Sequence, residues 1–207
     1  MDGFASLFSA FGLASAAGFN AYVPLLTVGL VARYTDLLRL AEPFDVLTQP
    51  WVLAVIGVLA VVDFVADKIP AVDTAWHGLG ALVSPIAGAV LFASQQNVLS
   101  DMHPAIGALA GLIVAGGFHG SRAAVRPVST ATTGGLGNPV LSLLEDLLSG
   151  LLSVLAVFLP VIAFGVAGLV AVIVVLMLMR AARAWRERKA ARLRPKARVT
   201  ASPCRST

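Results

Sequence analysis

Six long apolar runs divide this 207-residue chain and constrain its fold more than any other feature. The runs cover residues 3–33, 50–69, 77–94, 104–125, 139–159 and 160–179. A run of roughly 18 or more residues with few charges can cross the hydrocarbon core of a bilayer as a helix. Only 13% of the residues are charged, whereas a soluble domain usually has about 25%. This chain therefore has too few polar side chains to cover the surface of a soluble protein. We therefore predict an all-α integral membrane protein of about six transmembrane helices.

Some of these runs contain residues that interrupt helices. Gly12, Gly18, Asn20 and Pro24 lie inside the first run, so we expect its helix to be broken. The last two runs meet at Pro160 without a polar loop, and together they have twice the ~20 residues that one span needs. A tight helical hairpin is therefore expected there in place of one long helix.

Basic residues are concentrated after the last apolar run, where ten of the fifteen Lys and Arg side chains lie between Arg180 and Arg205. Such residues mark the cytoplasmic side of a membrane protein, so this distribution predicts orientation, and binding to nucleic acid is not expected. Six spans then place both termini, Lys68 and the Gly/Ser/Thr-rich linker 126–138 in the cytoplasm, with the acidic segment 34–49 outside. The tail, residues 181–207, is expected to be disordered beyond its first turns.

An offset of 99 residues aligns the first and fourth runs. Residues 12–20 and 111–119 then share five of nine positions, and Asn20 falls opposite His119. Each half of the chain, residues 1–96 and 97–180, would hold three spans, which predicts two inverted repeats. Transporters built in this way bind their ligands where broken helices meet near the middle of the membrane. Matching glycines also arise wherever helices pack closely, and this alternative stays open.

Four acidic residues lie inside the apolar runs, where an ionised side chain costs about 2.5–3.5 kcal/mol on insertion scales. Asp63 and Asp67 are four residues apart and share a helix face, while Glu145 and Asp146 are adjacent in the fifth run. Counted from the ends of their runs, these acids lie at a similar depth near the cytoplasmic side. We therefore predict one charged cluster that faces the interior of the bundle and comprises Asp63, Asp67, Lys68, Arg122, Arg126, Glu145 and Asp146.

Two interpretations of this cluster are open. Paired ions can fix the register of helices, and long side chains can reach the lipid headgroups, which suits Asp67, Lys68 and Arg126. A functional role is favoured for the three short acids that have apolar neighbours on both sides, which are Asp63, Glu145 and Asp146.

The remaining polar residues give weaker signals. His119 lies at an expected helix break, where it either binds an ion or relays a proton, or simply hydrogen-bonds to a neighbouring helix. The sequence contains no nucleophile elbow and no HExxH motif, and residues 134–137 lack the Lys and Ser/Thr of a phosphate loop. We therefore expect neither an enzyme nor a cofactor, and the identity of any metal ion is left open.

One combination of motifs resembles a known family. Asp63-x-x-x-Asp67-Lys68-x-Pro70-x-x-Asp73 is followed by Arg122-x-x-x-Arg126 and then by Asn138-Pro139-x-x-Ser142-x-x-Glu145-Asp146. This pattern, within residues 11–160, is similar to that of bacterial membrane proteins in the domain of unknown function 4126 family, which usually have Glu where this chain has Asp63. The resemblance implies a multi-pass protein of the bacterial cytoplasmic membrane, with Asp73, Asn138 and Ser142 supporting the charged motif.

These observations lead to two functional hypotheses. In the first, the protein is a small channel or secondary transporter for a cation or a proton-coupled solute. Its ligand would be bound by Asp63, Asp67, Glu145, Asp146, Asn20 and His119, with Lys68, Arg122 and Arg126 balancing charge or gating access. In the second, it is a scaffold or accessory subunit in the lipid bilayer. Small-residue surfaces such as residues 107–120, together with the basic tail, would hold a membrane partner or further copies of the chain. Dry acids paired with basic residues would favour the scaffold, whereas a water-accessible cavity with at least one unpaired acid would favour transport.

Overall fold

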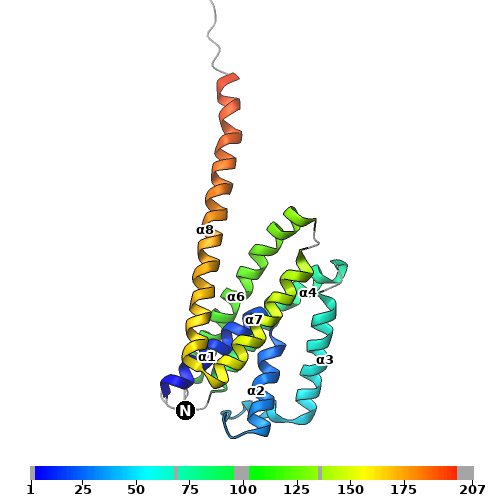
Figure 1. Ribbon diagram of the computed structural model, residues 1–207, viewed down its shortest axis with the longest axis vertical. Helices are drawn as coiled ribbons and strands as arrows, with labels where there is room; N and C mark the ends of the chain where they lie inside the picture. Colours follow the sequence, from blue (N-terminus) through cyan, green and yellow to red (C-terminus); the bar gives the residue numbers. More distant parts are fainter. Residues whose placement is uncertain (1–2, 68–69, 96–102, 135–136, 200–207) are drawn as a thin grey trace, which may run out of the picture. The chain divides into compact units, whose positions relative to one another are not determined.

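The computed structural model of the chain describes residues 3–67, 70–95, 103–134 and 137–199, and most of these residues are helical (Figure 1). The helices are α1 (Gly3–Phe19), α2 (Tyr22–Tyr34), α3 (Pro50–Ala66), α4 (Pro70–Ala93), α6 (Pro104–Thr133), α7 (Asn138–Phe158) and α8 (Pro160–Val199). A 3₁₀ helix, η1 (Phe44–Thr48), precedes α3, and an isolated β-bridge pairs Leu40 with Gln95. The predicted all-α class is confirmed for the described part of the chain.

Apolar length and apolar surface both agree with a membrane protein. Three stretches are long and apolar enough to cross a bilayer, namely Pro104–Pro127, Asn138–Phe158 and Pro160–Met177. Large apolar side chains on the outside of the helices, such as Leu109 on α6 and Leu147 on α7, are more than half exposed. Soluble monomers rarely expose contiguous apolar surface of this kind, whereas lipid chains cover it favourably.

The chain forms two compact units, Met1–Gly168 and Leu169–Thr207. The first unit holds α1 to α7 and the first turns of α8. In the second unit α8 continues as a helix to Val199, whereas the tail was expected to be disordered beyond its first turns. Alanine, arginine, lysine and glutamate dominate residues 180–199, and all four have high helix propensity, which accounts for the difference.

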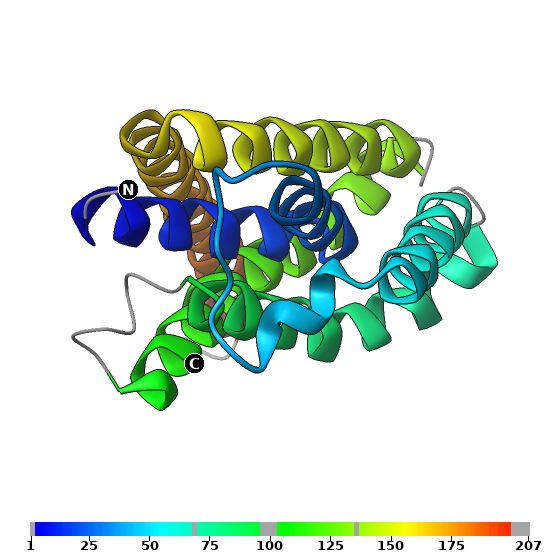
Figure 2. The ribbon, with the colours of Figure 1, turned by 90° about the horizontal axis from the view of Figure 1, so that it is seen from below.

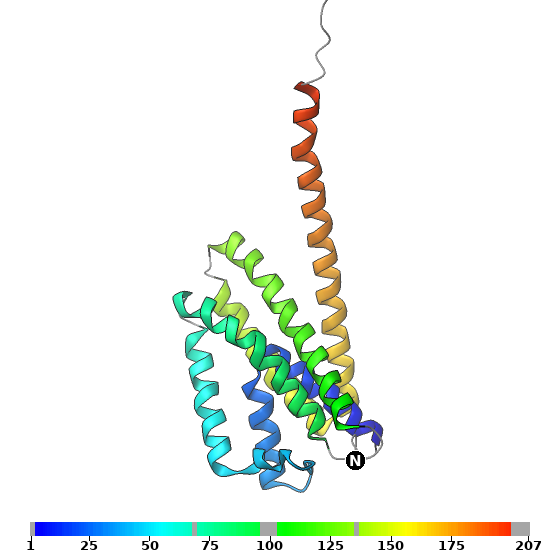
Figure 3. The same ribbon diagram turned by 180° about the vertical axis from the view of Figure 1, so that it is seen from behind.

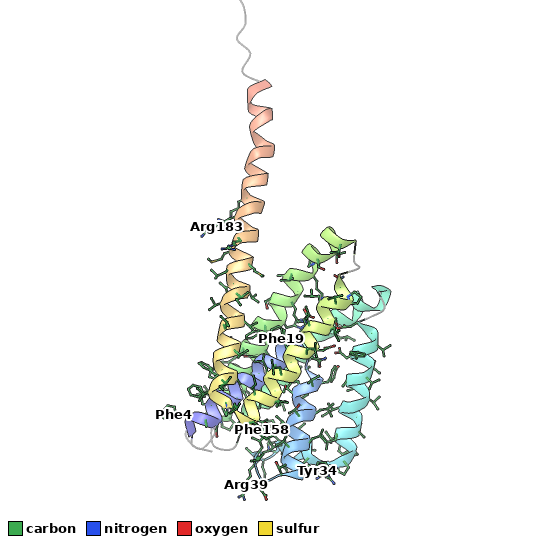
Figure 4. All side chains as sticks on the ribbon, viewed as in Figure 1. Phe4, Phe19, Tyr34, Arg39, Phe158 and Arg183 are labelled. Atoms are coloured by element: carbon green, nitrogen blue, oxygen red, sulfur yellow. The ribbon has the colours of Figure 1, made fainter. Side chains whose placement is uncertain are left out.

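The first apolar run forms two helices that turn back on one another. α1 ends at Phe19 and α2 begins at Tyr22, so the expected break lies at Asn20 and Ala21. Figure 4 shows the start of α1 and the end of α2 near the same end of the first unit, with Phe19 well inside it. In the view of Figure 2, α2 is seen nearly end-on while α1 lies across the picture. The two helices therefore form a re-entrant pair with its tip in the protein interior.

The middle of α1 and the segment beyond α2 both contact the end of α4. Phe11 of α1 packs edge-to-face against Phe92 near the end of α4, with ring centroids 5.0 Å apart. Beyond α2, the Ala41 N–H donates to the Ser94 carbonyl at 2.9 Å, again at the end of α4. The first run was expected to cross the membrane as one broken span, and the structure divides it into two helices that turn back on one another. Hydropathy shows that both halves of the run are apolar, but it does not show in which direction α2 runs. That direction is set by the contacts of α2.

The two helices that the 99-residue offset aligns do not have an inverted relation. Ala10 and Ala14 of α1 share a cluster with Ala110 and Val114 of α6, and further along both helices Gly18 lies against Phe118. α1 and α6 therefore run in the same direction.

The helix break expected at His119 is also absent. α6 continues without interruption through this residue. Both neighbouring helices lie against this residue, because Gly18 of α1 approaches the His119 backbone nitrogen and Gly80 of α4 approaches the His119 ring.

α4 and α6 are longer than the apolar runs that predicted them. α4 begins at Pro70, and α6 continues through Arg126 and Pro127 to Thr133, where a linker was expected. The hydroxyl of Thr133 donates to the Ser129 carbonyl one turn earlier at 2.8 Å, so polar residues here bond within their own helix. The helix stops at Gly134, whose φ of 63° is the left-handed conformation that glycine adopts without strain.

α7 and α8 are separate helices, as the sequence predicted. α7 ends at Phe158 and α8 begins at Pro160, with Leu159 between them in a non-helical conformation. Proline has no N–H to continue the hydrogen bonding of α7, but it is well suited to the first turn of a helix. The Leu159 carbonyl accepts the N–H groups of Ile162 and Ala163 at 3.0 Å each, which starts α8.

Glycines allow α4 and α6 to lie side by side (Figure 3). A Cβ at Gly111 would overlap the Gly88 carbonyl oxygen, and a Cβ at Gly88 would overlap the Cβ of Ala115. On α1, Gly18 lies equally close to Phe118. Several small residues of segment 107–120 are thus used for packing within the chain, which leaves less of that surface for a partner protein.

Candidate functional site

The site is built around the break between α1 and α2. Asn20 follows the last turn of α1, and its Oδ1 accepts the backbone N–H groups of Tyr22 at 2.9 Å and Val23 at 3.2 Å. The side chain therefore satisfies two of the four N–H groups that the start of α2 leaves without helical partners. Only 5% of Asn20 is exposed, so these backbone groups are paired where little water reaches them.

The carbonyl end of α1 is satisfied by side chains from α6 and α7. The hydroxyl of Ser149 lies 3.0 Å from the Ala16 carbonyl oxygen and 3.2 Å from that of Asn20, and it donates to this pair of acceptors. Nη1 of Arg122 donates to the carbonyl of Phe19. Non-helical backbone inside a membrane protein needs such partners, because lipid offers none.

The amide of Asn20 also joins two of the predicted acids. Its Nδ2 donates to Asp63 Oδ2 on α3 and to Asp146 Oδ1 on α7, each at 2.9 Å. One side chain thus holds carboxylates from two distant parts of the sequence against the tip of the re-entrant pair. The structure therefore brings these two acids together, as the cluster prediction requires.

The other two acids form a buried ion-pair network with both arginines. Glu145 Oε2 lies 2.8 Å from Arg122 Nε and 3.1 Å from Arg126 Nη2. Asp67 Oδ2 lies 3.7 Å from Arg122 Nη2 and 3.5 Å from Arg126 Nη2. Ser142 adds a hydroxyl donor 2.5 Å from the same Asp67 oxygen. All four charged side chains are less than 10% exposed, so removing one partner would leave a buried charge and destabilise the fold.

A cavity of about 230 Å³ opens beside the tip of the re-entrant pair. It is lined by residues of α3, α4 and α6 and of the break between α1 and α2, namely Asn20, Ala21, Tyr22, Leu59, Asp63, Asp67, Leu79, Gly80, Val83, Ser84, His119 and Arg122. On this measure a single water molecule needs only ~10–15 Å³, so the cavity has room for several. Asp63 and Asp67 therefore line a space large enough for water, while Glu145 lies outside the lining.

Sequence reasoning missed seven of the twelve lining residues, including Tyr22, Gly80 and Ser84. Tyr22 directly follows the break at Asn20, and this adjacency was the available signal. Gly80 and Ser84 are four residues apart on α4, so they share one helix face, but nothing in the sequence shows that this face meets His119. A Cβ on Gly80 would lie 3.1 Å from His119 Cε1, so this glycine leaves room for the imidazole ring.

The remaining predicted site residues lie elsewhere or outside the described part. Asn138 exchanges hydrogen bonds with Thr130 across the connection between α6 and α7, at 3.0 Å from its Nδ2, and does not line the cavity. Asp73 belongs to the second turn of α4, but its side chain, like Lys68 as a whole, lies outside what the structure describes. In the part of the chain that is described, no group of three or more His, Cys, Asp or Glu side chains is arranged to hold a metal ion.

The comparison with known families includes this whole site. A family model described as "domain of unknown function (DUF4126)" matches residues 7–180. The chain belongs to this family. Neither the curated proteins nor the solved structures contain a match to the chain. The matched region contains the re-entrant pair, both arginines and all four acids, so the resemblance inferred from the charged motif is confirmed.

Proposed function

We propose that this protein is a channel or secondary transporter for a small cation or a proton-coupled solute. The observation that carries this proposal is the cavity beside the re-entrant pair, with the Asp63 carboxylate in its wall. Broken helices that meet at a polar cavity are a recurring way to bind ions and solutes in transport proteins. Placing an ionisable residue inside a membrane costs free energy, and ligand binding in such a cavity would explain why the residue is there.

The charge balance supports a cationic ligand. Among the described residues of the site, four acids lie with two arginines, so this part of the site has more acidic than basic side chains. A cation that enters the cavity would be attracted towards the carboxylates of Asp63 and Asp67 in its lining.

We propose a topology of five crossings, by α3, α4, α6, α7 and α8, together with the re-entrant pair, in the bacterial cytoplasmic membrane. The basic tail supports a cytoplasmic end for α8. The Phe8 ring of α1 lies 4.9 Å from the Phe164 ring near the start of α8, which favours an N-terminus on the opposite, outer side. This differs from the six crossings, inverted repeats and two cytoplasmic termini expected from the sequence.

The scaffold hypothesis keeps one specific observation in its favour. Asp67 and Glu145 are buried and paired with arginines, as expected of ions that fix helix register. However, the small residues that would support an interface are partly used between α1, α4 and α6. The water-accessible wall at Asp63 also has no purpose in a scaffold. Transport therefore remains the better supported proposal.

Flux measurements test this proposal. The full-length protein is reconstituted in liposomes, and the influx of protons, Na⁺, K⁺ and small organic ammonium ions is measured. We expect flux of at least one of these ions, and Asp63→Asn should lower it by about tenfold or more, since a contact with a charged group contributes about 1.5–3 kcal/mol. Asp45→Asn removes an exposed acid in η1 and should leave flux unchanged. Absence of flux for every ion, with the protein folded, would contradict transport and favour the scaffold.

A further inference from the structure

The cavity lining combines two kinds of side chain. Seven lining residues are polar or charged, namely Asn20, Tyr22, Asp63, Asp67, Ser84, His119 and Arg122. Four are aliphatic, namely Ala21, Leu59, Leu79 and Val83. A ligand that satisfies this lining needs a positively charged head for Asp63 and an apolar part for the aliphatic side chains.

Inorganic ions do not use such a lining well. Mg²⁺ requires near-octahedral oxygen ligands and Ca²⁺ takes six to eight oxygens, in each case all around the ion. The aliphatic side chains offer no oxygen, so an inorganic ion would have to keep its water where it meets them. An organic cation, in contrast, gains free energy by removing the same side chains from water.

We propose that the ligand of this cavity is a small organic cation, a protonated amine or guanidinium-type ion with a short apolar substituent. This inference rests on the proposed cation site at Asp63 and names its class of substrate. The charged head donates hydrogen bonds to the Asp63 carboxylate, and the substituent packs on Leu59, Leu79 and Val83. Tyr22 adds an aromatic side chain to the lining, and aromatic faces attract organic cations.

The size of the cavity limits the substituent. Its volume of about 230 Å³ is below the ~300–1,000 Å³ of sites for drug-sized ligands, which favours a ligand of a few heavy atoms. Gly80 sets one boundary, because an added Cβ there would press on the ring of His119. Gly78, one half-turn earlier on α4, has no atom within 4 Å of its added Cβ. These two glycines therefore provide a matched pair of positions for a test.

Equilibrium binding to the full-length protein in detergent tests the inference. Titration calorimetry is carried out with methylammonium, ethylammonium, propylammonium and guanidinium, and with Na⁺, K⁺ and the uncharged analogues propanol and acetamide. Affinity should rise by about fourfold for each added methylene that becomes buried against the aliphatic side chains of the cavity. The uncharged analogues should not bind measurably.

Variants separate this inference from a general loss of structure. Asp63→Asn should abolish binding, whereas Asp63→Glu keeps the charge and should retain it. Gly80→Ala should weaken propylammonium more than methylammonium, while Gly78→Ala should bind both as the unchanged protein does. Binding of Na⁺ or K⁺ that depends on Asp63, without amine binding, would overturn the inference, as would an affinity that does not change with chain length. Amine binding without flux would contradict the transport proposal and support this inference. Flux of an inorganic ion without amine binding would support the transport proposal and contradict this inference.

Discussion

At the scale of single residues, Asn20 is the side chain on which the most interactions of the site depend. Its oxygen accepts two backbone N–H groups at the start of α2, and its nitrogen donates to Asp63 and Asp146. No other uncharged side chain can both cap a helix and donate to two carboxylates, apart from the longer glutamine. Replacing the amide by a carboxylate would add a third negative charge between two acids and remove both donors.

We predict that Asn20→Leu strongly destabilises the protein. The change removes two hydrogen bonds to charged groups, worth about 1.5–3 kcal/mol each, and leaves the start of α2 uncapped. Thermal unfolding of the purified protein in detergent measures the effect. Asn138→Leu is the matched control, because it loses only the bonds to Thr130 and should shift the midpoint little. Equal shifts for both variants would show that the bridging amide has no special role.

At the scale of helices, the crossing of α4 and α6 determines where Gly80, Ser84 and His119 meet. The crossing is close because Gly88 and Gly111 bring the two backbones together without side chains between them. In a membrane this packing is the main attraction between helices, since lipid tails are as apolar as the side chains. A wider crossing would move Gly80 and Ser84 of α4 away from His119 of α6.

We predict that Gly111→Ala lowers stability, because its Cβ would overlap backbone atoms of α4 that cannot move alone. Overpacking of this kind typically costs about 1–3 kcal/mol. Gly117→Ala, on the same helix, meets no atom within 4 Å and should be neutral or slightly stabilising, because alanine is the better helix former. Thermal unfolding in detergent compares the two, and a Gly111→Ala protein as stable as Gly117→Ala would contradict the close crossing.

At the scale of the whole molecule, the proposed topology does not count the re-entrant pair as a crossing, and this places the N-terminus on the outer side. Asn20 at the tip of the pair bonds to Asp63 and Asp146, whereas Phe11 of α1 and Ala41 beyond α2 contact the end of α4. In transport proteins, a tip of this kind places the ends of two short helices inside the bilayer without adding a crossing.

Cysteine labelling tests this topology, and Cys204 in the tail is the single native cysteine. In intact cells, an impermeant thiol reagent should label Gly3→Cys and Arg39→Cys, introduced into a Cys204→Ser background. Cys204 in the otherwise unchanged protein should be labelled only after the membrane is opened. Protection of Gly3→Cys together with Cys204 would instead support six crossings and two cytoplasmic termini.

Much of the architecture follows from the sequence because it depends on local pattern. The apolar runs predict the helical class, and Pro160 predicts the separation of α7 from α8. The charged cluster was also predictable, since unpartnered ions cannot face lipid and must find one another. The break at Asn20 was indicated by its polar side chain among small residues.

The rest depends on contacts that the sequence does not record. The direction of α2 after the break is set by packing on α3 and by the contacts beyond Tyr34. Hydropathy does not depend on the direction in which a helix runs. The match between Asn20 and His119 suggested two breaks, but α6 stays helical because α1 and α4 hold it on both sides. Tyr22, Gly80 and Ser84 are uncharged, so no charge marks them as site residues in the sequence. Only the fold brings them to the cavity.

The most direct test of the proposed site is the accessibility of its acids to water. In the Cys204→Ser background, Asp63→Cys and Glu145→Cys are purified and exposed to a small, charged, water-soluble thiol reagent, with folding checked by thermal unfolding. We expect Asp63→Cys to react, because its side chain lines the cavity, and we expect Glu145→Cys to react no faster than the cysteine-free protein. Background reactivity at both positions would mean that water does not reach Asp63, and it would contradict a transport site in this cavity.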